Sequence, residues 1–531
     1  MGQRKYHFLW GRKLLLALLL IFQIIFLIYF IISSSRRSEW ISGGLTALSV
    51  LAALYVVNRR EKDAYKLTWV FLILLFPIFG GLFYLLFSAQ TSAKMLAKKQ
   101  KAIELQSRKL FLLTGDRFAE AAAEAPESIP QIRYLQHFEG FPVYRHTGTT
   151  YLTPGERKFE YLVRELEKAE HYIFLEYFII REGVLWNTVE EVLARKAKEG
   201  VLVRVLYDDL GCFFSLPPEF PGKLAALGIQ CRAFNPFRPF LTTKQNNRDH
   251  RKIAVIDGKT AFTGGINLAD EYINTYEKYG HWKDAAIMIE GEAAWSFTLM
   301  FLEMWELTSA KSTSAKSTSG KPTSGEPTSQ KPEEYEEFYP WKEEACPVHS
   351  CGLVQPYADS PMDRENVGEH VYLQIINNAK QYVYINTPYL IVDNSMLSAL
   401  RLAAKSGIDV RIVTPHKWDK RLVHIATRSC YRDLILAGVK IYEYSLGFIH
   451  SKTFVSDDTV ATVGTTNLDF RSLYLHFECG VWMYGTAAVA EIKNDFLLTL
   501  ENCQRITEDD CRSTFAGRIV QDVLRLFGPR M

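Results

Sequence analysis

The chain has few of the features that mark disulfide-rich secreted proteins or nucleic-acid-binding proteins. Its eight cysteines are scattered over 531 residues, which excludes a dense disulfide framework. Lysine and arginine total 62 against 59 acidic residues, a formal net charge of +3, so no strong positive field favours a nucleic-acid partner. The one short Cys/His cluster, CPVHSC at 346–351, lacks the second ligand pair of a zinc site, which favours chance spacing or a local disulfide.

Long uncharged runs mark the first ninety residues, which differ sharply in composition from the rest of the chain. Residues 14–32 and 67–87 carry no charge and are long enough to span a bilayer, and residues 41–57 are marginally so. We expect residues 1–90 to form a multi-pass membrane anchor of two or three transmembrane helices over these ranges. A cleaved signal peptide is the alternative for the first run, but its core would be only about 7–15 residues long.

Two features bear on the orientation of this anchor. Four lysines and arginines precede the first run and two separate it from the second, while four more follow each of the other two. By the positive-inside rule this favours a cytoplasmic N-terminus, and three spans would then place the rest of the chain outside. The cysteines point slightly the other way. The sequence is therefore compatible with either side of the membrane for the rest of the chain.

The stretch NNRDHRKIAVIDG, residues 246–258, places His250 and Lys252 two positions apart before an apolar run that Asp257 closes. In a strand, residues i and i+2 project from the same face, so an imidazole and an ammonium group would lie side by side. One such pattern is most simply a structural or solvated histidine.

The same pattern recurs in FIHSKTFVSDD, residues 448–458, with His450, Lys452 and Asp457 at the same spacing. In both copies an asparagine follows the histidine by seventeen residues, Asn267 in FTGGINLAD and Asn467 in TVGTTNLDF. A match of four polar residue types at fixed offsets indicates an internal duplication rather than chance.

The duplication extends upstream of these motifs. KAEHYIFLEYFI at 168–179 is similar to NAKQYVYINTPYLI at 378–391, and AKEGVLVRVLYD at 197–208 is similar to AKSGIDVRIVTP at 404–415. A period of about 200 residues indicates two domains rather than a solenoid. Apolar runs alternate with helical patterns in each half, which predicts α/β layers. The domains expected after the anchor are a connecting segment at 91–130, a first domain at 131–307, a Ser/Thr/Lys/Pro-rich linker at 308–342 and a second domain at 343–531.

If the halves pack face to face, the duplicated groups would suit a phosphodiester. The two ammonium groups would neutralise the non-bridging oxygens, and the two asparagine amides would add donors. One imidazole can attack phosphorus to give a phosphohistidine while the other protonates the departing alkoxide. Because the lysines supply the positive charge, the reaction requires neither a metal nor another cofactor.

A nucleophilic histidine also needs an acceptor on its second ring nitrogen, which fixes the tautomer. Glu478 in LHFECG and Asp284 in GHWKDAAIM are the candidates. Asp257 and Asp457 would lie on the strand face opposite their histidine and lysine. By this parity we expect them to order the strand end more than to touch substrate.

The doubled H-x-K-x4-D motif, each followed by G-G/T-x-N, resembles the phospholipase D superfamily. The hydrophobic N-terminal runs and the stretches GGINLADEY and GTTNLDFRSLYLHFE are similar, more specifically, to those of bacterial cardiolipin synthases, from about residue 40 to the C-terminus. The resemblance implies duplicated α/β/α sandwich domains that share one active site. The catalytic residues it implies are His250, Lys252, Asp257, His450, Lys452 and Asp457.

The resemblance also implies roles for these residues. His250 would be the nucleophile, His450 the general acid and then base, and Glu478 the residue that orients a histidine. His476 departs from the pattern, since we expect an asparagine there, as in LNFE.

The implied reaction joins two phosphatidylglycerol molecules to give cardiolipin and glycerol at a bacterial cell membrane. A hydrolytic phospholipase D and a phosphatidyltransferase with another acceptor alcohol are the near alternatives. A membrane-tethered nuclease is disfavoured by the near-neutral charge, and a non-enzymatic scaffold would not need two complete motifs. The expected partners are membrane lipids and no nucleic acid, while nothing in the sequence indicates the oligomeric state.

Overall fold

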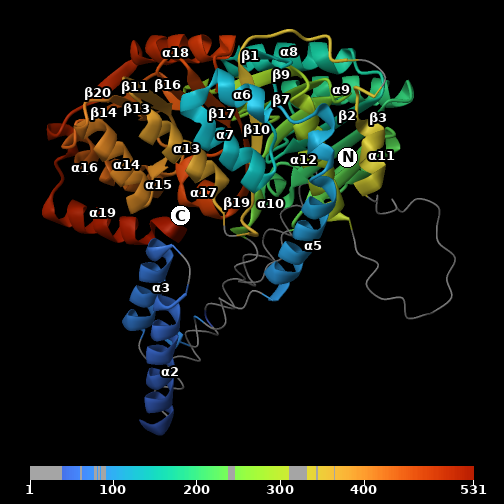
Figure 1. Cartoon of the computed structure of the whole chain (residues 1–531). Helices are drawn as coiled ribbons and strands as arrows, with labels where there is room; N and C mark the ends of the chain where they lie inside the picture. The colour runs from blue at the N-terminus through green and yellow to red at the C-terminus, as the bar shows by residue number, and fades with distance from the viewer. Residues whose placement is uncertain are drawn as a thin grey trace.

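The computed structural model places an α/β body above a pair of projecting N-terminal helices (Figure 1). The described residues are 39–59, 62–76, 91–236, 246–309, 332–342, 345–363 and 365–530, together with Ile25, Gly80, Gly81 and Tyr84.

The first half is built on a seven-stranded mixed sheet in the order β1-β9-β7-β6-β2-β3-β4. Strands β2, β3 and β4 are parallel, and the pairs from β2 through β6, β7 and β9 to β1 are antiparallel. The strands are β1 (Thr147–Leu152), β2 (Tyr172–Tyr177), β3 (Leu202–Asp208), β4 (Gln230–Phe234), β6 (Lys252–Ile256), β7 (Thr260–Gly264) and β9 (Ala286–Gly291).

The second half repeats this topology strand for strand, in the order β10-β19-β17-β16-β11-β13-β14, with β20 added antiparallel to β14 at the edge. The equal order confirms the duplication. The strands are β10 (Leu353–Asp359), β11 (Tyr382–Asn386), β13 (Asp409–Pro415), β14 (Lys440–Tyr444), β16 (Thr453–Ser456), β17 (Val460–Gly464), β19 (His476–Tyr484) and β20 (Cys503–Ile506). A two-stranded pair joins β12 (Leu390–Ile391) to β18 (Leu468–Asp469).

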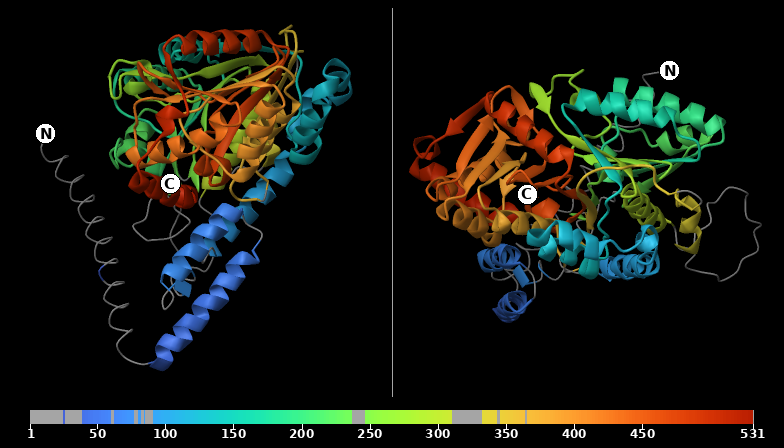
Figure 2. Two further views of the ribbon diagram at one scale, coloured as in Figure 1. Left: turned by 90° about the vertical axis from the view of Figure 1, so that its left-hand side faces the viewer. Right: turned by 45° about the horizontal axis from the view of Figure 1, so that its top comes forward.

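Helices cover both faces of each sheet (Figure 2). The first half carries α8 (Gly155–Glu167), α9 (Val184–Lys198), α10 (Asp209–Cys212), α11 (Phe220–Ala226), η5 (Asp270–Ile273) and α12 (Ala294–Thr308). The second carries α13 (Val367–Asn378), α14 (Asn394–Lys405), α15 (Arg421–Ser429), α16 (Tyr431–Ile435), α17 (Phe470–Tyr474), α18 (Ala487–Leu500), η7 (Asp509–Cys511), α19 (Phe515–Phe527) and η8 (Gly528–Arg530). Ahead of β1, the chain forms α5 (Thr91–Ser107), η1 (Leu110–Thr114), α6 (Phe118–Glu124), η2 (Pro126–Ser128), α7 (Ile129–Arg133) and η3 (Tyr134–Glu139).

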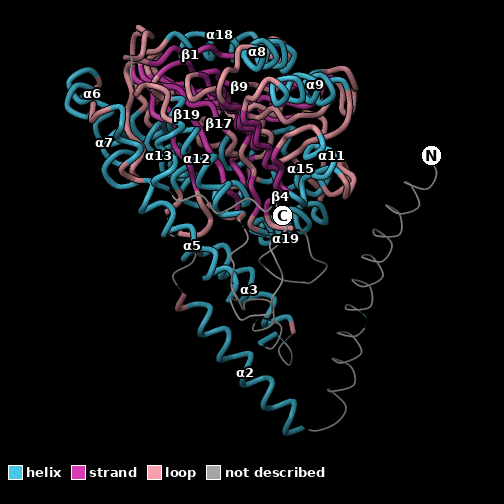
Figure 3. The backbone as a smooth tube through the Cα atoms, turned by 90° about the vertical axis from the view of Figure 1, so that its right-hand side faces the viewer, coloured by secondary structure: helices cyan, strands magenta, loops and turns pink. Residues whose placement is uncertain are grey.

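The alternation of side chains along β2 explains the layers. Ile173 and Leu175 belong to one core cluster with residues of α8 and α9, whereas Phe174 belongs to another with residues of α12. Successive side chains of a strand point to opposite faces, so a strand covered on both faces is apolar throughout. The cluster around α12 also contains residues of β10, β19 and α18. The two halves therefore share one continuous core, and the sheets lie together at the centre of the body (Figure 3).

The N-terminal helices correspond only in part to the expected transmembrane spans. Residues 14–32 lie, but for one residue, outside the described part of the chain. Residues 41–57 fall within α2 (Glu39–Val57), and the first part of 67–87 falls within α3 (Asp63–Leu75). Among the described residues, no helix combines the length and apolar character needed to cross a membrane.

The structure also bears on the expected linker and on the CPVHSC stretch. Residues 332–338, at the end of the expected linker, form the 3₁₀ helix η6 (Pro332–Phe338), whose Tyr335 is buried. The middle of that linker lies outside the described residues. A local disulfide in CPVHSC is wrong, because Cys346 and Cys351 are both free thiols. The Cys346 thiol instead contacts the carbonyl of His146.

Candidate active site

Each motif histidine is delivered by a short strand that pairs with the other half of the molecule. Strand β5 (Arg248–Asp249) runs parallel to the start of β19, and β15 (Gly447–Ile449) runs parallel to β8 (His281–Lys283). The amide of His250 donates to the carbonyl of Phe477 at 2.9 Å, and that of His450 to Lys283 at 2.7 Å. The pairing of β5 with β19 is equivalent, under the duplication, to the pairing of β15 with β8. In each case the residue that follows the hydrogen-bonded carbonyl lies beside the histidine of the opposite half.

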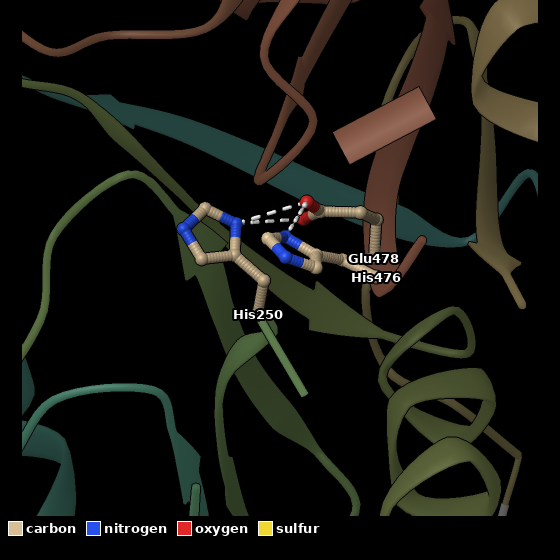
Figure 4. A group of neighbouring side chains, drawn as sticks. All are labelled: His250, His476 and Glu478. Carbon is tan, nitrogen blue, oxygen red and sulfur yellow. Dashed lines mark hydrogen bonds and ion pairs between the residues drawn. The ribbon is translucent and has the colours of Figure 1, made fainter. Parts of the chain in front are cut away.

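Those next residues are the two carboxylates that the sequence singled out. The Nδ1 atom of His250 lies 2.9 and 3.0 Å from the two carboxylate oxygens of Glu478, as Figure 4 shows. The Nδ1 atom of His450 lies 2.7 Å from Asp284 Oδ2. Both carboxylates are fully buried. A carboxylate on Nδ1 fixes the tautomer that leaves Nε2 unprotonated in the neutral ring, which is the nucleophilic form.

Burial and the interaction within each histidine–carboxylate pair determine the protonation states of these side chains. Burial lowers the pKa of His250 to about 3 and that of His450 to about 4, with the paired carboxylates opposing the shift. Burial alone would raise the pKa of Glu478, but His250 holds it well below its usual range. In the protein without ligand, both imidazoles are therefore neutral and Glu478 is ionised at pH 7.

The two motif lysines are buried beside the histidines. Each ammonium group donates to the carbonyl of its own motif histidine. Burial lowers the pKa of Lys252 to about 8 and that of Lys452 to about 7. The Lys252 charge also lowers the pKa of His450, so the two motifs act on each other across the interface. One cleft thus holds two imidazoles and two amines.

The two asparagines differ in their contacts. Asn267 Nδ2 donates to the Tyr272 hydroxyl at 2.7 Å, and its Oδ1 accepts from the Ile179 amide at 3.0 Å. Its amide is therefore directed to the protein. The Oδ1 atom of Asn467 is buried and has no hydrogen-bond partner among the described residues. Of the two, Asn467 is the one with hydrogen-bonding capacity left for a ligand.

Asp257 and Asp457 occupy the tight turns that follow β6 and β16, at positive φ of 51° and 53°. The Asp257 carboxylate accepts from three consecutive amides, Glu170 to Tyr172, at 2.6–2.8 Å. That of Asp457 accepts from the amides of Lys380 to Tyr382 at 2.7–3.0 Å. These contacts tie the motif turn to the start of β2 or β11, in keeping with the parity argument. A catalytic role for either aspartate therefore stays a prediction from the motif alone.

The sequence did not anticipate the aromatic rings around the histidines. Phe178 lies edge-on to His250 with ring centroids 5.0 Å apart, and Tyr272 and Trp282 lie 5.7 and 5.3 Å from His450. Of these three aromatic residues, only Trp282 could have been anticipated from the sequence, because it lies two residues before the candidate carboxylate Asp284. These rings help to desolvate the imidazoles, which is the main cause of their low pKa values.

Models of known protein families match both halves of this chain. The family model described as "Cardiolipin synthase, PLD-like domain" matches residues 162–305 and 372–499, and one described as "Phospholipase_D-nuclease N-terminal" matches residues 47–88.

The full-length relatives and one solved structure extend the comparison. An uncharacterized protein of Streptococcus mutans is 42% identical over 90% of this chain and 99% of its own length. A cardiolipin synthase of Alkalihalophilus pseudofirmus is 34% identical over 94% and 96%. The crystal structure of a phosphatidylserine synthase of Haemophilus influenzae superposes with a TM-score of 0.53 at 13% identity, covering 74% of this chain and 96% of that one, which shows a shared fold.

Proposed function

The chain belongs to the cardiolipin synthase family of phospholipase D-like proteins, and on that premise we propose that it transfers a phosphatidyl group between two phosphatidylglycerol molecules, giving cardiolipin and glycerol. One observation carries the proposal: two histidine–carboxylate pairs, each formed across the interface between the halves, converge with two lysines. A displacement at phosphorus needs one nucleophile and one proton donor, and the duplication supplies both.

In the first step, His250 Nε2 attacks phosphorus while Glu478 holds the proton on Nδ1. The bond from phosphorus to the glycerol oxygen breaks, and His450 Nε2 donates its proton to that oxygen. His450 is neutral in the protein without ligand, but the negative charge of a bound phosphodiester raises its pKa and favours the protonated form. The products are free glycerol and a phosphatidyl group on His250.

In the second step, the hydroxyl of another phosphatidylglycerol gives its proton to His450 and attacks phosphorus. The bond to His250 breaks, cardiolipin forms, and both imidazoles return to their first state. The leaving and entering groups are both primary alcohols, so the overall exchange is close to isoenergetic. Burial of the histidines, at 7% and 8% exposure, limits the access of water to the intermediate.

The test is a product balance. Purified full-length protein is incubated with phosphatidylglycerol, and cardiolipin, glycerol and phosphatidic acid are quantified together. Equal amounts of cardiolipin and glycerol are expected. Phosphatidic acid without cardiolipin would make the protein a hydrolytic phospholipase D. Transfer seen only after serine or ethanolamine is added would identify another acceptor alcohol. Loss of each product in the His250→Ala variant is the control against contamination.

The lysines predict how anion binding depends on pH. Both amines are charged below pH 7 and lose their protons as the pH rises through about 7 for Lys452 and about 8 for Lys252. A charge-assisted hydrogen bond contributes about 1.5–3 kcal/mol. We therefore expect the affinity of the His250→Ala variant for phosphatidylglycerol to fall at least about tenfold between pH 6 and pH 9.

The Lys452→Arg variant is the matched control, because arginine keeps its charge throughout this range. Its affinity should fall less over the same interval. If the protein with both lysines showed the same affinity for phosphatidylglycerol at pH 6 and pH 9, the assignment of the ammonium groups to the phosphate would be contradicted.

We further propose that the lower surface of the body in Figure 1 rests on a membrane. The helix α3 meets the C-terminal helix α19 there, with Thr68 Oγ1 donating to the Leu526 carbonyl at 2.7 Å. Residues Phe515, Ile519 and Val523 of α19 are 44–79% exposed, which gives this helix an apolar outer face next to the anchor.

Hydrogen exchange of the full chain in phosphatidylglycerol vesicles tests this surface. The amides of α19 should be protected relative to the Ile519→Glu, Val523→Glu variant. The matched control is Leu498→Glu on α18, at the top of Figure 1, which should leave exchange in α19 unchanged. If α19 exchanged equally in the unsubstituted chain and in the double variant, the proposal that α19 contacts the membrane would be wrong.

A further inference from the structure

His476 is a buried imidazole without a hydrogen-bond partner. Its exposure is 8%, and neither ring nitrogen makes a hydrogen bond to any described residue. Its Nδ1 lies 3.7 Å from the Glu478 carboxylate, which is longer than a hydrogen bond, so the ring keeps a nitrogen with which it can bind a metal. We propose that His250, His476 and Glu478 form a binding site for a divalent metal of the zinc type, and that metal bound there stops phosphatidyl transfer.

The geometry of the three side chains is close to that of a zinc site. The ligating atoms lie within 4.8 Å of one another, and both imidazoles lie beside the Glu478 carboxylate (Figure 4). Nδ1 of His476 is 3.7 Å and Nδ1 of His250 is 2.9 Å from Glu478 Oε1. Metal–ligand bonds of about 2.0–2.1 Å in a tetrahedron separate the ligands by about 3.3 Å. Sub-ångström shifts of these two contacts would meet that value.

The donor set selects the kind of metal. Two imidazole nitrogens and one carboxylate oxygen suit Zn²⁺ and related transition ions, whereas Ca²⁺ and Mg²⁺ prefer oxygen ligands throughout. Three protein ligands leave a fourth position for water. The ammonium groups of Lys252 and Lys452 share the cleft, and their repulsion makes the metal a reversible occupant rather than a permanent one.

The other half of the molecule lacks the third ligand. There the position equivalent to His476 is Trp282, two residues before Asp284 as His476 is two residues before Glu478. The Trp282 indole donates toward Asp284 at 3.4 Å, and an indole cannot ligate zinc. His450 and Asp284 are left as a pair, so we expect one metal for each chain.

Metal at this site acts on the proposed nucleophile. The ion replaces the proton on Nδ1 of His250, and that proton passes to solvent. The ring then shares electron density with the metal, which weakens attack by Nε2, and Glu478 no longer supports the imidazole. The blocking effect rests on the proposed transferase function, whereas the binding itself does not.

Binding is measured first, without lipid. Full-length protein is titrated with ZnCl₂ against a zinc-sensitive dye, and one ion per chain is expected. The His476→Asn variant should bind zinc at least about tenfold more weakly. The matched control is His349→Asn, which removes the only histidine of the CPVHSC stretch and should leave binding unchanged. No binding to the unsubstituted chain, or equal binding by the His476→Asn variant, would overturn the proposal.

Inhibition is measured second, with each protein compared with its own rate without metal. Zinc should suppress product formation from phosphatidylglycerol, a chelator should restore it, and the His476→Asn variant should need at least about tenfold more zinc. Zinc binding at His476 without any inhibition would refute the blocking role alone. Binding without any transferase activity in the metal-free protein would refute the proposed function and leave the metal site standing.

Discussion

The His250→Ala variant should lose phosphatidyl transfer by at least about 10⁴-fold with every substrate. The other imidazole near Glu478, that of His476, lies 3.7 Å from the carboxylate instead of 2.9 Å, and without the His250 nucleophile neither step can begin. The His450→Ala variant should lose as much with phosphatidylglycerol, because the departing glycerol must be protonated.

The two variants should differ when the leaving group needs no proton. A phosphatidyl ester of p-nitrophenol releases a stable phenolate. The His450→Ala variant should therefore release p-nitrophenol in a burst and retain the phosphatidyl group on His250. The His250→Ala variant should release none above background.

Rapid-mixing absorbance and mass spectrometry of the trapped peptide measure the two quantities. Each histidine is paired with a carboxylate of the opposite half, so this experiment also decides between their roles. A burst in the His250→Ala variant, with the label on His450, would reverse the assignment. Release without a burst or a label in either variant would rule out the covalent intermediate.

The Glu478→Gln variant should lower turnover by about 10²–10⁴-fold without unfolding the protein. A glutamine of the same shape can present its NH₂ group or its carbonyl to His250, but neither holds the Nδ1 proton as an ionised carboxylate does. Glu478 belongs to the second half of the chain and the nucleophile His250 to the first. The loss of turnover would therefore come from the 2.9 and 3.0 Å contacts between the two halves.

The Asp257→Asn variant is the matched control for this loss of a carboxylate. Its contacts are backbone amides of Glu170, His171 and Tyr172, and the change should lower the free energy of unfolding by about 2 kcal/mol. The unfolding midpoint and the turnover of the folded fraction are measured for both variants. A larger loss of turnover in the Asp257→Asn variant than in the Glu478→Gln variant would contradict the division of roles.

Much of this protein could be predicted from local sequence. The apolar runs of β2 and β6 define strands, because every residue of these two strands is buried. The spacing of His250 and Lys252, repeated at His450 and Lys452, indicated a phosphodiester site. The parity of a strand separated Asp257 from both, since residues an odd number apart point to opposite faces.

Other features depended on which strands meet in space. Nothing in the sequence determines that β5 pairs with β19 and β15 with β8, so the assignment of Glu478 to His250 and of Asp284 to His450 came only from the tertiary structure. The same pairings bury His476 beside Glu478, with no hydrogen bond from its ring to any described residue.

The sequence by itself determined the duplication, the layered α/β halves and the chemical groups, because these follow from periodicity and residue type. Only the tertiary structure decided which carboxylate serves which histidine, how burial lowers the pKa values of the histidines and lysines, and which asparagine remains available. Those properties depend on distances between residues about 160 to 230 positions apart. Such distances are set by the packing of two halves against each other, and local sequence does not specify them.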